Sequence, residues 1–246
     1  ISLAEILIEK GLCPVAAAGH SLGEYCAVVV AGSLSAEQGM RLVLERGRLM
    51  ASAPEGTMAA VLGLELSALE ELCRRVEVSG ECCVVANDNA PGQVVVSGSK
   101  NGMEGLAVLA KAAGARRVVL LNVGGAFHSP LMKSAGEAFS EQLDRVSFQD
   151  PSFPIAAGVS GAISASADAV RTGLRDQLAG PVRWVATIQA LAGRGAESFV
   201  ECGPGSVLAG LNRRIMPNSP VVSVDSPESC AELLAPDGSG AAPGAG

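Results

Sequence analysis

The pentapeptide Gly19–Gly23 (GHSLG) constrains the fold of this 246-residue chain more than any other feature. An apolar segment typical of a buried strand precedes it at 15–18, and an apolar stretch typical of a helix follows at 22–31. The pattern G-x-S-x-G between a strand and a helix is the nucleophile elbow of α/β folds. Ser21 is then presented at a helix N-terminus, where free N–H groups favour negative charge. The alternative interpretation is an ordinary serine in a glycine-rich turn.

A nucleophilic serine needs a general base, and the chain has only two histidines, His20 and His128. His20 adjoins Ser21, and neighbouring side chains diverge at such a turn. His128 lies in the string GGAFHSPLM, where two glycines precede it and an apolar helix start follows. This pattern suits a loop over a cleft, although a lone histidine is usually structural. The sequence therefore predicts that His128 is the base if Ser21 is the nucleophile.

Arg46 lies on the apolar face of a helix predicted over 35–50. Ser35 and Gln38 form the S-x-x-Q pattern of a capping box at the start of this helix. Gly39, Val43 and Met50 lie on the same face of the predicted helix as Arg46. The guanidinium of Arg46 is therefore expected to point inward, where an arginine without a partner is strongly unfavourable. Either an internal carboxylate pairs with it, or it awaits an anionic ligand.

Residues 57–123 have the element order βαββαβ, which is the order of a ferredoxin-like unit. The predicted strands cover 58–64, 82–87, 93–98 and 115–123, and the predicted helices cover 67–76 and 102–114. The flanking segments, 1–56 and 124–235, alternate between helices and short strands, with strands predicted over 154–159 and 221–224 and a helix over 207–215. They are expected to form one α/β domain around this insert. The final segment, 236–246, is poor in bulky apolar groups and is expected to be disordered.

A series of strings between about residues 15 and 215 resembles the malonyl-CoA:acyl carrier protein transacylases and the related acyltransferase domains of fatty-acid and polyketide synthases. The strings are GHSLGEY, LERGRLM, PEGTMAAVLG, NAPGQVVVSG, GAFHSPLM, QLAGPVRW and ECGPGSVLAGL. The resemblance implies an α/β-hydrolase-like acyltransferase domain with an inserted ferredoxin-like subdomain. It also implies transfer of a malonyl group from malonyl-CoA to the phosphopantetheine thiol of acyl carrier protein, through a malonyl-serine intermediate, in fatty-acid biosynthesis.

The same resemblance implies a role for each candidate residue. Ser21 is the acylated nucleophile, His128 is its base, and Arg46 grips the free carboxylate of malonate. The main-chain carbonyl of Gln177 orients His128 in place of the acid of a triad. The N–H of Leu22 is one donor to the oxyanion. No bound cofactor or metal is implied.

The start of the chain departs from the family pattern. The family opens with a strand and a GQG-containing loop that lines the oxyanion site, whereas the residues before Ser21 contain no GQG. The sequence is therefore expected to lack an N-terminal segment of the family. Two other functions stay open: a serine esterase or thioesterase on the same elbow, and a non-catalytic module that binds CoA or a carrier protein.

Charge and cysteine content restrict the partners and the compartment. The chain has 18 basic and 25 acidic residues, and a net charge of −7 argues against binding to nucleic acids or to anionic membranes. No apolar run approaches the ~18 residues of a membrane span. Seven cysteines without CxxC spacing favour reduced core residues of a cytoplasmic protein over disulfides or metal ligands. A monomer is expected.

Overall fold

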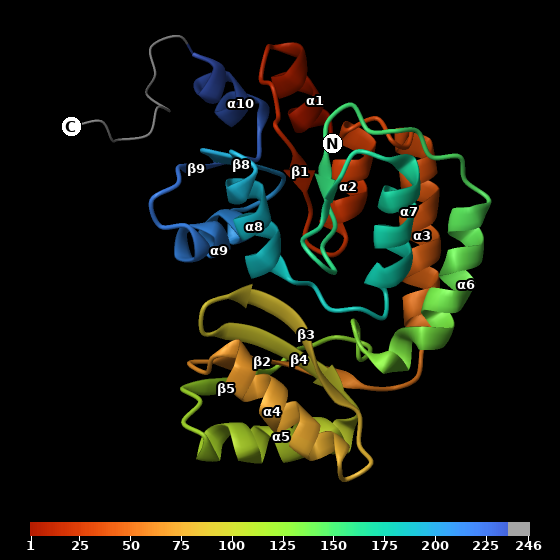
Figure 1. Ribbon diagram of the computed structural model, residues 1–246, viewed down its shortest axis with the longest axis vertical. Coiled ribbons are helices and arrows are strands. Elements are labelled where there is room, and N and C mark those ends of the chain that lie inside the picture. Colours follow the sequence, from red (N-terminus) through yellow and green to blue (C-terminus); the bar gives the residue numbers. More distant parts are fainter. Residues whose placement is uncertain (236–246) are drawn as a thin grey trace.

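The computed structural model describes residues 1–235, so the expected disorder of 236–246 lies outside the described residues. Figure 1 shows two halves: short strands surrounded by helices in the upper half, and a broader sheet in the lower half with two helices on its outer face. None of the helices in the described part of the chain is both long and apolar enough to cross a membrane.

Helices and short strands alternate along much of residues 1–235. The helices are α1 (Ser2–Glu9), α2 (Gly23–Val30), α3 (Ala36–Ala51), α4 (Leu66–Glu77), α5 (Lys100–Ala112), the 3₁₀ helix η1 (Pro130–Met132), α6 (Lys133–Asp144), α7 (Ala167–Gln177), α8 (Trp184–Gly193), α9 (Val207–Ile215) and α10 (Pro227–Leu234). The strands are β1 (Ala17–Ala18), β2 (Thr57–Leu62), β3 (Cys83–Ala90), β4 (Gln93–Gly98), β5 (Arg117–Leu120), β6 (Ile155–Ala156), β7 (Ile163–Ser164), β8 (Phe199–Cys202) and β9 (Val221–Val224).

The lower half contains a four-stranded antiparallel sheet in the order β3-β4-β2-β5. This order, together with the sequence βαββαβ, confirms the predicted ferredoxin-like arrangement. Side chains alternate along β2, so that Ala59 and Val61 join the core beneath α4 and α5 while Met58 faces the other way. Helices α4 and α5 cover the outer face of this sheet (Figure 1).

The inner face of the same sheet supports the segment that leads to His128. Met58, Ala86 and Val95 are buried there, and Leu121, Val123 and Phe127 pack against them. Residues 121–127 are thereby held in place without being a strand themselves. The apolar side chains at the end of the ferredoxin-like unit thus fix the position at which the chain returns to the upper half.

The upper half is built on very short strands. Strand β1 pairs in parallel with β6 over two residues each, and β6 pairs with β7, whereas β8 and β9 form a separate parallel pair. The strands predicted over 15–18 and 154–159 are therefore too long, because ladder pairing in the structure covers only 17–18 and 155–156. Helices α2, α3, α6 and α7 enclose a core that includes Tyr25, Phe139 and Leu174.

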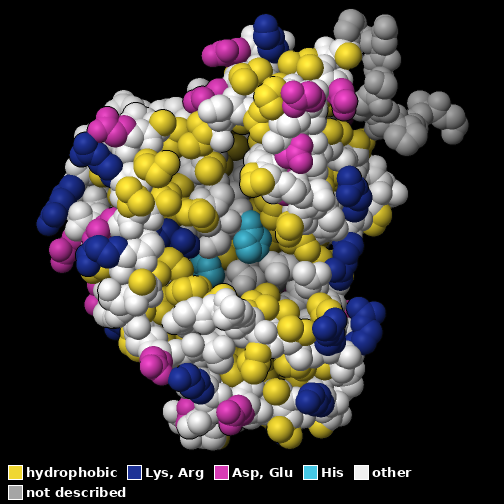
Figure 2. Space-filling view, turned by 180° about the vertical axis from the view of Figure 1, so that it is seen from behind, with side chains coloured by type: hydrophobic (Ala, Val, Ile, Leu, Met, Phe, Trp, Pro, Cys, Tyr) yellow, Lys and Arg dark blue, Asp and Glu magenta, His cyan; other side chains and the backbone are white. Residues whose placement is uncertain are grey.

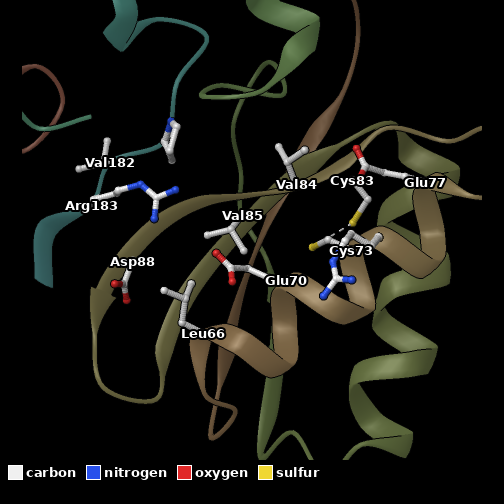
Figure 3. Close-up of a pocket in the computed structure, with 12 residues that line it drawn as sticks. Leu66, Glu70, Cys73, Glu77, Cys83, Val84, Val85, Asp88, Val182 and Arg183 are labelled. Atoms are coloured by element: carbon white, nitrogen blue, oxygen red, sulfur yellow. Dashed lines mark hydrogen bonds between the residues drawn. The ribbon is translucent and has the colours of Figure 1, made fainter. Parts of the chain in front are cut away.

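The expectation that the cysteines are reduced is consistent with the structure, but their predicted place in the core is only partly right. All seven are free thiols; Cys73, Cys83 and Cys230 are buried, whereas Cys13, Cys26 and Cys202 are exposed. Figure 3 shows Cys73 and Cys83 at one end of a hollow between α4 and β3. The hollow has a volume of about 300 Å³, and the two Sγ atoms lie 3.6 Å apart. This hollow is lined by none of the candidate site residues.

Candidate active site

The turn between β1 and α2 holds Ser21 in a left-handed backbone conformation with φ 48°. Gly19 makes the turn possible, because a Cβ at this position would lie 2.0 Å from the carbonyl carbon of Gly23. A Cβ at Gly23 would meet nothing within 4 Å, so the second glycine of the pattern is not needed for close packing. The predicted order of strand, turn and helix is confirmed.

Ser21 and His128 meet although they lie 107 positions apart, with Ser21 Oγ 2.8 Å from His128 Nε2. Within residues 1–235 they are the only residues other than glycine with a positive φ, and φ of His128 is 56°. Such backbone conformations cost energy and concentrate at functional sites. Figure 2 shows the two histidine side chains of the chain in a hollow between the two halves.

Two main-chain carbonyl groups fix the ring of His128. Its Nδ1 lies 3.0 Å from the carbonyl oxygen of Gln177 and 3.0 Å from that of Gly180. Because carbonyl oxygens only accept, Nδ1 carries the proton and donates it, which leaves Nε2 to accept from the Ser21 hydroxyl. Burial, together with the charge of Arg46, lowers the pKa of His128 to about 4. The ring is therefore neutral near pH 7, as a base must be.

Arg46 reaches the same serine from the middle of α3. The capping box of this helix is present, with Ser35 and Gln38 bonded to each other's backbone N–H, and it fixes the start of α3. The guanidinium of Arg46 is buried, and its Nη2 donates to Ser21 Oγ at 2.8 Å. Within residues 1–235 it forms no ion pair, and its Nε has no hydrogen-bond partner. Of the two alternatives left open by the sequence, the internal ion pair is therefore not formed.

The remaining candidates lie around this centre. Leu22 is the N-cap residue of α2, so its N–H, next to Ser21, belongs to the groups for which a helix has no internal acceptor. His20 is turned to the other side: its Nε2 lies 2.8 Å from Asn89 Oδ1, and its ring contacts that of Trp184 at 5.6 Å between centroids. The geometry thus agrees with the exclusion of His20 as the base of Ser21.

Comparison with known proteins agrees with this geometry. The sequence model of the acyl transferase domain matches residues 1–230. The malonyl CoA-acyl carrier protein transacylase of Bacillus subtilis (strain 168) is 39% identical over 232 residues, which are 93% of this chain and 73% of that protein. This chain belongs to the malonyl-CoA:acyl carrier protein transacylase family of acyl transferases.

Solved structures show that the transacylase fold is shared as well. A crystal structure of malonyl-CoA:acyl carrier protein transacylase from Xanthomonas oryzae pv. oryzae matches with a TM-score of 0.90 at 37% identity, over 95% of this chain and 75% of that one. A malonyl-transacylase in complex with its type II polyketide-synthase acyl carrier protein also reaches 0.90, at 38% identity, over 95% of this chain and 76% of that one. The predicted acyltransferase fold is therefore confirmed.

Two groups beside Ser21 and His128 are not predicted from the sequence. The carbonyl of Gly180 carries no signal in its residue type, because every residue has a carbonyl. Glu24 did carry a signal: it is the one charged residue in the apolar string GEYCAVVV of α2. Its carboxyl is buried and accepts from Gln177 Nε2 at 2.7 Å and from the N–H of Gly158 at 3.2 Å.

Proposed function

We propose that this transacylase moves a malonyl group from malonyl-CoA to the phosphopantetheine thiol of acyl carrier protein, through a malonyl-Ser21 intermediate, in fatty-acid biosynthesis. One observation carries the residue roles: Ser21 Oγ lies 2.8 Å from His128 Nε2 and 2.8 Å from Arg46 Nη2. In this proposal the nucleophile lies between a neutral base and a buried cation that has no carboxylate partner within residues 1–235. Membership of the transacylase family supports the choice of substrate and acceptor.

In the first half-reaction, Ser21 Oγ attacks the thioester carbonyl while its proton passes to His128 Nε2. A C–O bond forms, and the carbonyl oxygen becomes an oxyanion at the start of α2, where the N–H of Leu22 is a donor. The carbonyl re-forms as the C–S bond breaks. The leaving CoA sulfur then takes the proton from His128, so CoA leaves as the thiol and malonyl-Ser21 remains.

The second half-reaction uses the same groups in reverse. His128, neutral again, takes the proton of the carrier-protein thiol, and the sulfur attacks the malonyl-Ser21 ester. The Ser21 oxygen leaves and regains its proton from His128. The carbonyl groups of Gln177 and Gly180 stabilise the protonated ring in both directions by accepting from Nδ1, as the acid of a triad does.

Arg46 suits the free carboxylate of the malonyl group. A guanidinium binds a carboxylate with two parallel charge-assisted hydrogen bonds, and the buried Nε of Arg46 has no hydrogen-bond partner within residues 1–235. An acetyl group has no carboxylate to place there. Arg46 therefore favours the diacid substrate while its Nη2 stays close to the reacting oxygen.

The remaining properties in this proposal follow from the same residues. Acyl transfer by Ser21 and His128 moves only protons and an acyl group, so we expect no bound cofactor or metal. All the candidate residues belong to one chain, so a monomer suffices for the site. Seven free thiols, three of them exposed, favour a reducing compartment, the cytoplasm.

The partition of the acyl group between thiol and water tests the proposed function. After one turnover with radiolabelled malonyl-CoA and excess phosphopantetheinylated carrier protein, most of the label should be on the carrier protein. The control is carrier protein without the phosphopantetheine group, which should leave the label on the enzyme. Rapid release of free malonate in both samples would instead identify a thioesterase, and no turnover at all would identify a non-catalytic binding module.

The pH dependence of acylation should reflect the lowered pKa of His128. Because only the neutral ring accepts the Ser21 proton, kcat/KM should fall as the pH drops through about 4, not through the ordinary value of 6.5. Burial raises the pKa of Glu24 to about 7, close to the ordinary histidine value, so a parallel series on Glu24→Gln removes the contribution of Glu24 to the profile. Rapid-quench CoA release between about pH 5 and 8 should be flat in Glu24→Gln. An inflection near 6.5 that persists in this variant would show that His128 is not desolvated.

A further inference from the structure

Glu24 is a buried carboxyl without a part in the steps above. It lies in the first turn of α2, three positions after Ser21, and is 2% exposed. Burial of a carboxyl is costly, and here it raises the pKa of Glu24 to about 7 although two hydrogen bonds and the charge of Arg46 act against the shift. An apolar residue of similar size would avoid this cost, so the contacts of the carboxyl need a reason.

The surrounding chain leaves space for this carboxyl at two glycines. A Cβ at Gly158 would lie 2.9 Å from Glu24 Oε2, and a Cβ at Gly173 would lie 3.6 Å from Oε1 and 3.2 Å from the Cβ of Ala157. The N–H of Gly158 donates to Oε2, and its carbonyl accepts from the N–H of Arg183. The carboxyl is thus enclosed by α2, α7 and the segment after β6.

Gln177 connects this carboxyl to both members of the Ser21–His128 pair. Its side-chain Nε2 donates to Glu24 Oε2 at 2.7 Å and to the main-chain carbonyl of Ser21 at 3.0 Å. Its own carbonyl oxygen accepts from His128 Nδ1 at 3.0 Å. Gln177 is the last residue of α7, and these two bonds from Nε2 are the hydrogen bonds that its side chain makes within residues 1–235. Without the Glu24 acceptor, one of the two N–H groups of this amide would lose its partner.

We propose that Glu24 is a positioning residue of the acyl-transfer site, which anchors the Gln177 amide so that Gln177 holds the Ser21 turn and the His128 ring in register. This inference rests on the proposed function of Ser21 and His128. In this proposal the Glu24 carboxyl does not contact the substrate. A displacement of about 1 Å between two reacting groups can cost on the order of 100-fold in rate, so a residue that keeps Ser21 and His128 in place affects the rate without contacting the substrate.

The test compares Glu24→Ala and Glu24→Gln by rapid-quench acylation with malonyl-CoA. We expect Glu24→Ala to lower the acylation rate constant roughly 10- to 100-fold, with a change in KM below about twofold, because no substrate contact is lost. Glu24→Gln should restore the rate to within about threefold of wild type, since its amide oxygen can accept both bonds. Equal rates in wild type and Glu24→Ala would overturn the proposal, and so would a Glu24→Gln variant as slow as Glu24→Ala.

Glu201 provides the matched control for a carboxylate with a purely structural role. It accepts from the N–H groups of Leu208 at 3.0 Å and Ala209 at 2.8 Å, at the start of α9. Glu201→Ala should lower the melting temperature and leave the acylation rate of the folded protein unchanged. The contrast separates loss of positioning from loss of stability.

Nitrogen-15 NMR of labelled histidine gives a readout that does not depend on activity. The chain has only two histidines, so His20 serves as the internal reference. His128 should show a single tautomer with the proton on Nδ1 in wild type and in Glu201→Ala, and a shift towards mixed tautomers in Glu24→Ala. An unchanged His128 tautomer in Glu24→Ala would overturn the proposal even if activity fell.

Gln177→Met keeps the test decisive if Glu24→Ala does not fold. This variant removes the side-chain amide and retains the main-chain carbonyl that His128 uses. It should be slowed to the extent expected for Glu24→Ala, because it removes the same link from its other end. An acylation rate like that of wild type in Gln177→Met would contradict that link. If wild type itself formed no acyl-Ser21, the proposed function would fail, and the tautomer measurement would still report on the anchor.

Discussion

Ser21→Ala should lower malonyl transfer by about 10⁴-fold or more while leaving the melting temperature within about 3 °C of wild type. The reason is that Ser21 Oγ is hydrogen-bonded to both His128 and Arg46, and the substitution removes that atom alone. Stopped-flow CoA release and a thermal melt on the same sample give both values. Transfer at more than a hundredth of the wild-type rate would place the nucleophile elsewhere.

Ser35→Ala is the matched control for this substitution. Ser35 caps α3 by accepting from the N–H of Gln38, and loss of an N-cap costs about 1 kcal/mol of stability. This variant should melt about 2–4 °C lower and acylate at the wild-type rate. We therefore expect opposite outcomes for the two variants: Ser21→Ala loses activity and keeps its stability, whereas Ser35→Ala loses stability and keeps its activity.

Arg46→Ala should reduce malonyl transfer far more than acetyl transfer. Removing one partner of a desolvated charge pair costs about 2–5 kcal/mol, so the ratio of kcat/KM for malonyl-CoA over acetyl-CoA should fall by roughly 30-fold to several thousand-fold. The acetyl rate reports any loss that arises from the contact of Arg46 with Ser21 itself. Steady-state kinetics with both thioesters measure the ratio.

Two further variants sharpen the interpretation of Arg46. Arg46→Lys keeps the charge but lacks the planar pair of donors, so it should recover only part of the ratio. Arg48 lies on the same helix and pairs with Glu45 at the surface. Arg48→Ala should therefore change neither the malonyl nor the acetyl rate. Equal losses for malonyl and acetyl groups in Arg46→Ala would mean that Arg46 only orients Ser21.

Elements with a strong local pattern could be predicted from the sequence, whereas those fixed by pairing could not. Helix α9 and strand β9 have the predicted bounds, Val207–Ile215 and Val221–Val224, because their apolar periodicity is contained in the segment itself. Strand β6 is shorter than predicted, because its length depends on where β1 and β7 lie beside it. Helix α10 was missed, since it is short and its buried side, at Cys230, is created by packing against α1 and β9.

The candidate site divides in the same way. Ser21 could be predicted from the elbow pattern, and Arg46 from the helical periodicity. His128 could be predicted because the one other histidine, His20, adjoins Ser21. The roles of the Gly180 carbonyl and of the Gln177 side-chain amide could not be predicted, because the residue type does not tell where the main-chain carbonyl or the side chain points. The division of the chain into 1–56, 57–123 and 124–235 stays a prediction.

The identity of the acylated atom tests the central claim most directly. Wild-type protein incubated briefly with malonyl-CoA, quenched in acid and digested should yield one peptide with an added malonyl mass, and fragmentation should locate it on Ser21. A chase with phosphopantetheinylated carrier protein before the quench should remove that mass and place it on the carrier thiol. A malonyl group on any other residue, or one on Ser21 that carrier protein does not remove, would contradict the account.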